Sequence, residues 1–324
     1  MPLVISHTGS LVEPIGPEAE EFIKALRSEN TRRQYAEALE HFSRYLFNSY
    51  GMTIGDFLAE VEADLARPRL QKTFISRKAL SGFSDYLSAL GKAPKTVNCY
   101  VSVVQSLAKY YDIPISIKYV KRPPVKPINK KHAWTIREIG QFVEMMDDIR
   151  FKCIAAVIVQ SGLSISDVLA IKYGDIREEY EKGISPLCLD LSRMKTNVQF
   201  LTFIGEWALS LLRQHLKGKR LSDDKPVFDV ARRTVDEYFR RVGQKFGSFK
   251  GRNPYSPHSL RAAFNTILRD HKVDHVYVEF WMGHKLPEQQ IVYVSKSREG
   301  WRETYRTMAE PWLTPPNFKP MSRV

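Results

Sequence analysis

Apolar side chains recur at helical spacing through the first third of the chain, with polar residues on the opposite faces. The stripes are Tyr35, Leu39, Phe42 and Leu46; Phe74, Leu80, Phe83, Leu87 and Leu90; and Val97, Val101, Val104, Leu107 and Tyr111, with a shorter stretch over 54–65. Asn30 can cap the first stripe, Gly91 can end the second, and the third begins at Thr96. Four helices of this size predict a small bundle.

The pattern changes after residue 133. Thr135 and Glu138 have the capping-box spacing that opens a helix. Alternating apolar residues at 187–191 and 198–202 flank a polar turn at 193–197, which predicts a β-hairpin. Helices are expected over 151–160, in the turn and helix of 161–171, and over 205–216, 233–246, 257–270 and 273–282. The sequence therefore predicts a mainly α protein, with an N-terminal helical bundle and a second, mostly helical domain carrying a small β-hairpin.

A stretch rich in proline and basic residues separates the two parts. It has no acidic residue between Asp112 and Glu138, and its prolines favour extended chain. We expect a helical domain at 1–117, a basic linker at 118–132, a second domain at 133–312 and a tail at 313–324. Lys121, Arg122, Lys130 and Lys131 either follow a phosphate backbone or only solvate the linker.

The overall charge favours a polyanionic partner. The net charge of +13 indicates nucleic acid before an anionic membrane, and no apolar run approaches the roughly 20 residues of a membrane span. The first 16 residues have no basic start typical of a signal peptide. Cys99, Cys153 and Cys188 match no zinc or disulfide spacing, which favours buried thiols in an intracellular protein.

Chemically capable residues follow one another in the second domain. Lys195 lies on the predicted hairpin, His258 and Arg261 open a helix after a proline, and Gly283-His284 ends another helix nine residues before Tyr293. Singly these are weak signals, because a His-x-x-Arg pair or a Gly-His pair is common by chance. In this order and spacing, over nearly the whole chain, the sequence resembles the tyrosine recombinase family, which includes the phage integrases.

The resemblance implies the organisation of the protein. The N-terminal bundle would be a SAM-like core-binding domain for double-stranded DNA, and residues 133–312 the catalytic domain. Family members pair on DNA half-sites, synapse as tetramers and pass a C-terminal segment to a neighbour. Here the apolar residues after the tyrosine either form such a segment or pack on their own domain: Trp301, Tyr305, Met308 and Trp312. The expected location is the cytoplasm, at the nucleoid.

The residue types suit strand exchange without an energy source. A tyrosine oxygen, here Tyr293, can attack phosphorus and hold the DNA as a phosphotyrosine until another strand end attacks it. The guanidinium of Arg261 can stabilise the extra negative charge on the phosphate. His258 and His284 can donate hydrogen bonds and help move the nucleophile's proton. The resemblance makes Lys195 the proton donor to the leaving oxygen, and no metal or cofactor is expected.

One position departs from the family pattern. The family expects an arginine where Ser164 stands, in the stretch 161–167, and a serine cannot grip a phosphate bidentately. Arg193 is the first candidate to substitute, because alternation along a strand would point it the same way as Lys195; Arg177 and Arg150 are the other candidates. Either cleavage is retained, or the protein only binds DNA. A third hypothesis treats 161–171 as part of a helix-turn-helix regulator.

Overall fold

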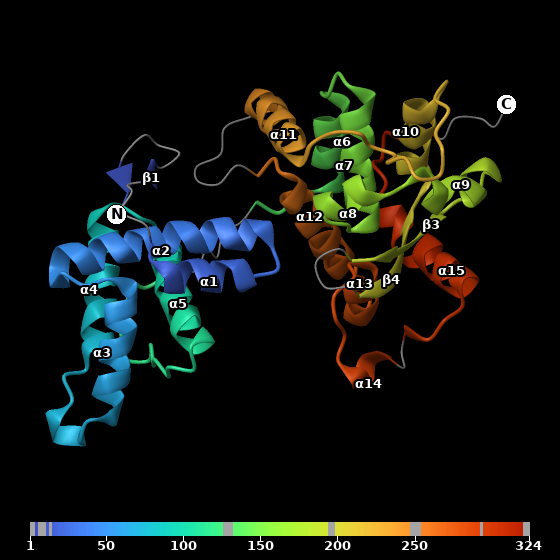
Figure 1. The fold of residues 1–324 in the computed structure, drawn as a ribbon. Helices are drawn as coiled ribbons and strands as arrows, with labels where there is room; N and C mark the ends of the chain where they lie inside the picture. The colour runs from blue at the N-terminus through green and yellow to red at the C-terminus, as the bar shows by residue number, and fades with distance from the viewer. Residues whose placement is uncertain are drawn as a thin grey trace. The chain divides into compact units, whose positions relative to one another are not determined.

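The computed structural model describes residues 4–5, 11–12, 15–125, 132–193, 198–246, 254–291 and 294–319. The chain divides into two compact units, residues 1–129 and 130–324 (Figure 1). Each unit has its own hydrophobic core. The predicted fold class, mainly α with a helical N-terminal bundle, is confirmed.

The first unit is a bundle of helices. Its described elements are β1 (Val4–Ile5), β2 (Leu11–Val12), α1 (Pro17–Ala25), α2 (Glu29–Tyr50), α3 (Ile54–Ala66), η1 (Arg69–Gln71), α4 (Ile75–Ala89) and α5 (Pro94–Tyr110). The predicted stripes form the core, where the ring of Phe42 packs 5.2 Å from that of Phe57 and 5.0 Å from that of Phe83. Helix α1 was not among the predicted helices, because its sequence offers only a short apolar stripe, of which Phe22 is buried.

Two predicted helix starts are wrong. Asn30 lies inside the first turn of α2, and Ser28 occupies the N-cap position. Helix α5 begins at Pro94 and not at Thr96, because the fixed φ of proline suits the first turn of a helix and its missing N–H costs nothing there. Helix α3 opens with a capping box between Thr53 and Asp56.

Residues 118–125, the first part of the predicted linker, pack on the bundle. Val120 is buried in its core. The backbone N–H of Lys121 donates to Ser81 Oγ at 3.1 Å, and Asn98 Nδ2 donates to the Pro123 carbonyl at 3.3 Å. The side chains of Lys121 and Arg122 are exposed, whereas Lys130 and Lys131 lie outside the described residues.

The second unit is mostly helical around one hairpin. Its described elements are α6 (Ile136–Glu144), α7 (Ile149–Ser161), α8 (Ile165–Ala170), α9 (Tyr173–Glu181), β3 (Leu187–Ser192), β4 (Gln199–Ile204), α10 (Glu206–Leu216), α11 (Arg232–Phe246), α12 (Pro257–Asp270), α13 (His275–Trp281), α14 (Glu288–Ile291), α15 (Arg298–Met308) and η3 (Glu310–Trp312). The predicted hairpin and the capping box at Thr135 are confirmed, with β3 and β4 antiparallel from Leu187↔Ile204 to Ser192↔Gln199.

Helix α7 is the centre of this unit (Figure 1). It packs against α10, α12 and β4, and it is buried from Cys153 to its end, as expected for a helix that is apolar on every face. The hydroxyl of Thr202 on β4 donates to the Ser161 carbonyl at 2.7 Å. This bond ties the hairpin to the end of α7, where the candidate site begins.

The apolar residues of the C-terminal segment divide into two groups. Trp301 and Tyr305 on α15 are buried within the second unit, and the Tyr305 hydroxyl donates to the Gln160 carbonyl at 2.7 Å. Met308 and Trp312 are partly exposed, and Trp312 stacks on His271. Trp301 and Tyr305 therefore pack on their own domain, while contact of the exposed Met308 and Trp312 with a neighbouring protomer stays a prediction.

The expectation of buried cysteines is wrong for one residue. Cys153 and Cys188 are buried, but Cys99 on α5 is exposed. It lies on the polar side of an amphipathic helix whose apolar stripe is formed by Val97, Val101 and Val104.

Candidate active site

Two glycines end helices next to the site. Gly162 follows α7 with φ 67°, and Gly283 follows α13 with φ 64°, a left-handed conformation that favours glycine. Each also packs closely on a ring: an added Cβ would lie 2.6 Å from Phe264 at position 162 and 2.9 Å from Phe200 at position 283. Each glycine turns its carbonyl oxygen toward an arginine.

Arg261 is held on α12 by carbonyl oxygens. Its side chain is buried, Nη1 donates to the Gly162 carbonyl, and Nη2 donates to the Met282 carbonyl at 2.9 Å and lies 2.9 Å from His284 Nε2. Burial, and after it the positive charge of Arg193, lowers the pKa of Arg261 to about 10. The guanidinium thus stays protonated near neutral pH, in a position with little water to solvate it.

Arg193 brings a second positive charge to the same place. Its Nη1 donates to the Gly283 carbonyl at 3.1 Å, its side chain is half-buried, and its charge acts on Arg261. Arg193 directly follows Ser192, the last residue of β3, and the alternation argument stays a prediction because Lys195 lies outside the described residues. Its backbone N–H donates to the Val198 carbonyl at 2.9 Å, at the pair of residues next to Ser192↔Gln199.

His284 joins Arg261 to a carboxylate. Its Nδ1 lies 2.5 Å from Oε2 of Glu279, which belongs to α13. Sequence reasoning missed Glu279, since an acid five residues before a histidine is ordinary in a surface helix. Its role is visible only because Gly283 reverses the chain and returns His284 to the helix.

His258 lies in the first turn of α12, three residues before Arg261, and its side chain is exposed. Residues three apart on a helix share a face, so the two side chains lie on one side of α12. The start of the helix is fixed by Ser256, whose Oγ accepts from the Ser259 N–H at 3.2 Å.

Ser164 serves as a helix cap. Its Oγ accepts from the Asp167 N–H at 3.4 Å and donates to Asp167 Oδ2 at 2.6 Å, at the start of α8. The position where the family expects an arginine is thus occupied by a local structural contact. The other candidate substitutes are engaged away from this cluster, Arg177 with Asp223 at 2.9 Å and Arg150 with Asp148 at 3.3 Å.

Lys195 and Tyr293 lie outside the described residues, so the structure does not place them. It does place Tyr305, a second tyrosine that follows His284, at a distance of 21 residues. That side chain is fully buried, and burial raises its pKa well above the usual range. A hydroxyl in this position neither reaches DNA nor ionises readily.

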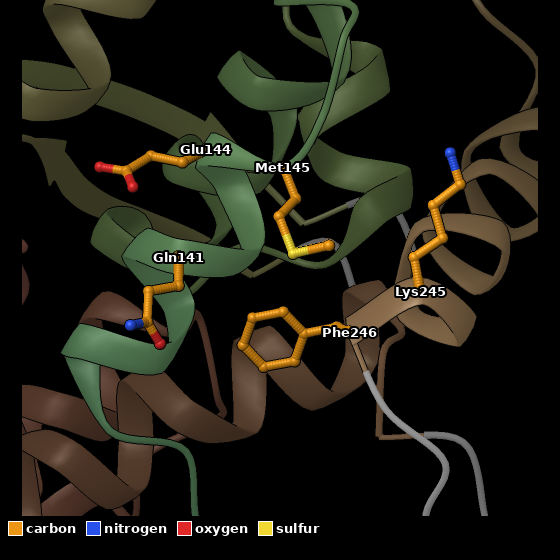
Figure 2. A pocket seen from close by; sticks show the side chains of 5 residues that line it. All are labelled: Gln141, Glu144, Met145, Lys245 and Phe246. Carbon is orange, nitrogen blue, oxygen red and sulfur yellow. The ribbon is translucent and has the colours of Figure 1, made fainter.

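A separate pocket lies between α6 and α11. Figure 2 shows Gln141, Glu144 and Met145 on one side and Lys245 and Phe246 on the other. None of these residues belongs to the Arg261 cluster. Within the described parts of the chain no three His, Cys, Asp or Glu side chains come together as a metal site would need, and no helix has the length and apolar character to cross a membrane.

Comparison with known proteins decides the family. The model of the phage integrase family matches residues 133–299. The chain belongs to the phage integrase family. This integrase-family chain is 22% identical over 287 residues to tyrosine recombinase XerA of Pyrococcus horikoshii, covering 83% of this chain and 92% of XerA. It is 24% identical over 260 residues to the ICEBs1 integrase of Bacillus subtilis, covering 69% of each protein.

Solved structures agree on the fold. A lambda integrase dimer bound to a core site matches with a TM-score of 0.56 and 16% identity, over 85% of this chain and 93% of that one. A post-cleavage complex of the XerH recombinase on palindromic difH matches with a TM-score of 0.56 and 16% identity. The match covers 89% of this chain and 83% of the XerH chain. The family model and the curated recombinase relatives make this integrase-family chain an enzyme of the recombinase class. The regulator hypothesis also fits poorly with α8, whose six residues are partly buried.

Proposed function

We propose that this protein cuts and rejoins double-stranded DNA at specific sites through a 3′-phosphotyrosine at Tyr293. The observation that carries the proposal is the convergence of Arg261, Arg193 and His284 around Gly283, in a domain of the phage integrase family. Two guanidinium groups and an imidazole held together form a site suited to an anion with several oxygens, such as a DNA phosphate.

Each group has a role in the proposed step. The Tyr293 oxygen bonds to phosphorus as the bond from phosphorus to the 5′-oxygen breaks. Lys195 gives a proton to that leaving oxygen, while His258 or His284 takes the proton of the tyrosine. Arg261 and Arg193 stabilise the charge that builds on the other phosphate oxygens. Rejoining runs the same transfers backwards, so bond energy is conserved.

In this proposal, Arg193 supplies the guanidinium that the family has at the position of Ser164. Its guanidinium lies close enough to Arg261 for their charges to repel, as expected for two donors that share one phosphate. The burial of Tyr305 supports Tyr293 as the nucleophile.

Assembly and location follow from the reaction. Solved neighbours include a lambda integrase dimer on a core site and a lambda integrase tetramer on a Holliday junction. We propose the same for this chain, with dimers on half-sites and tetramers in synapsis, acting in the cytoplasm at the nucleoid. The exposed side chains of Lys121 and Arg122 would then follow the DNA backbone together with Lys130 and Lys131.

A suicide DNA substrate tests the proposal. Such a substrate loses a short strand after cleavage and traps the covalent adduct. The wild-type protein should form an adduct, Tyr293→Phe should form none while binding DNA nearly as well, and Tyr305→Phe should still form it. Binding without any adduct from the wild type would favour a DNA-binding protein that has lost cleavage.

A further inference from the structure

The contacts of His284 define where its proton lies. A guanidinium only donates hydrogen bonds, so His284 Nε2, 2.9 Å from Arg261 Nη2, must present its lone pair. A neutral imidazole then carries its hydrogen on Nδ1, and that nitrogen lies 2.5 Å from Oε2 of Glu279, an acceptor. Two contacts on opposite sides of the ring therefore require the same tautomer.

Glu279 is itself oriented by its neighbours. Asn265 Nδ2 donates to Oε1 at 3.4 Å, while Arg269 Nη2 and His275 Nε2 each lie 3.6 Å from the same oxygen. These donors come from α12 and the start of α13, and the Glu279 side chain is only 20% exposed. Oε1 is thus engaged on one side, and Oε2 is left facing His284.

We infer that Glu279 is a positioning residue that keeps the hydrogen of His284 on Nδ1 and its Nε2 lone pair toward the phosphate site. The inference rests on the proposed function. When a DNA phosphate takes the Arg261 donor that now bonds His284, Nε2 is released beside the reacting group. It can then accept a proton there. Arg261 and Glu279 contact the ring itself, and Arg193 donates to the carbonyl of the preceding Gly283.

Of the charged groups next to His284, the negative carboxylate of Glu279 is the one that stabilises a positively charged imidazole. A carboxylate that holds a catalytic histidine in one tautomer and stabilises its charged form is known from the serine protease triad. Here the carboxylate comes from a recombinase helix, and it compensates in part for the two nearby arginines, whose charges oppose a third cation.

Nitrogen NMR on protein with 15N-labelled histidine reads the tautomer directly. The signals of His284 are assigned by their loss in His284→Gln. In DNA-free wild type at mildly alkaline pH, Nδ1 should show the shift of a protonated nitrogen and Nε2 that of an unprotonated one. In Glu279→Gln the amide can also donate to Nδ1, so this preference should weaken or reverse.

Cleavage gives the functional readout. Single-turnover cleavage by Glu279→Gln should fall about 10- to 100-fold, by analogy with the loss of the carboxylate partner of a metal-binding histidine, with DNA affinity unchanged. Glu144→Gln is the matched control, because it makes the same change at an exposed glutamate of α6, outside the Arg261 cluster. It should cleave within about twofold of wild type, since surface substitutions are usually small in effect. Glu279→Asp should retain the tautomer signals at least in part.

Two results would overturn the inference. One is wild-type His284 with its hydrogen on Nε2, a measurement that needs no variant to fold. The other is Glu279→Gln with wild-type signals and wild-type cleavage. If the wild type forms no adduct at all, the proposed function fails, while the NMR still decides the role of Glu279 separately.

Discussion

The two arginines of the site are held in different ways. Arg261 is 5% exposed and fixed by the carbonyl oxygens of Gly162 and Met282 and by His284. Arg193 is half-buried, directly follows the last residue of β3, and donates to the Gly283 carbonyl. A donor fixed before the reaction needs no reorganisation when charge develops, whereas a half-buried side chain loses freedom on binding. The Arg261 side is therefore preorganised, and the Arg193 side is the adaptable half.

The largest effect is expected on the preorganised side. Arg261→Ala should lower single-turnover cleavage by about 10²- to 10³-fold, the scale for losing a fixed donor to a developing oxyanion. It also leaves the carbonyls of Gly162 and Met282 without this donor, so the midpoint of thermal unfolding should fall. Arg261→Lys keeps the charge without the fork and should recover only part of the rate. Wild-type cleavage by Arg261→Ala would remove this residue from the site.

A smaller loss of cleavage rate is expected when Arg193, on the adaptable side, is replaced. Arg193→Ala should lower cleavage about 10-fold or more, because one cationic donor is lost from a partly solvated position. DNA affinity in a gel shift should change little. Arg177→Ala is the matched control, since that arginine pairs with Asp223 away from the cluster. Equal cleavage by Arg193→Ala and Arg177→Ala would show that Arg193 does not replace the family arginine.

Restoring the family arginine at position 164 should add a third guanidinium to the Arg193 side of the site. Ser164→Arg should raise the cleavage rate if the longer side chain reaches the phosphate. It also removes the cap of α8, which costs about 1 kcal/mol of folding stability. Ser164→Ala removes the same cap without adding a charge, so a rate increase confined to Ser164→Arg would be due to the guanidinium. A rate no higher than that of Ser164→Ala would mean that the site is not short of a cation.

The smallest effect on cleavage is expected from the basic residues of the linker. Replacing Lys121, Arg122, Lys130 and Lys131 by Ala should flatten the salt dependence of DNA binding by about 0.9 log units per lost phosphate contact. Cleavage of bound DNA should stay near wild type. Fluorescence anisotropy across a salt series measures the slope, and an unchanged slope would argue against contact of this segment with the backbone.

Local features of the fold were predictable from sequence. The capping box at Thr135, the hairpin, and α12 from Pro257 depend on neighbouring residues, and each forms as expected. Helices α9 and α15 were not foreseen. Helix α9 is rich in charged residues, whereas α15 does carry a helical apolar stripe, with Trp301, Tyr305 and Met308 spaced four and three residues apart. The cap of α2 was misassigned by two residues, since Ser28 and Asn30 are both suitable cap types.

The candidate site was predictable only in part. Spacing and family resemblance singled out Arg261 and His284, which the structure brings together. The roles of Gly162, Gly283 and Glu279 were not predictable, because they depend on α7, the hairpin, α12 and α13 meeting in space. Arg193 was proposed from alternation with Lys195, and its side chain does reach the Gly283 carbonyl, a contact that alternation alone could not predict.

The central claim, covalent catalysis by Tyr293, is tested most directly by locating the DNA on the protein. The adduct trapped on a suicide substrate is digested with nuclease and trypsin, and its peptides are weighed by mass spectrometry. Tyr293 falls in the tryptic peptide 286–296 and Tyr305 in 303–306. The account predicts a residual nucleotide on 286–296, attached at Tyr293. A nucleotide on any other peptide would contradict it.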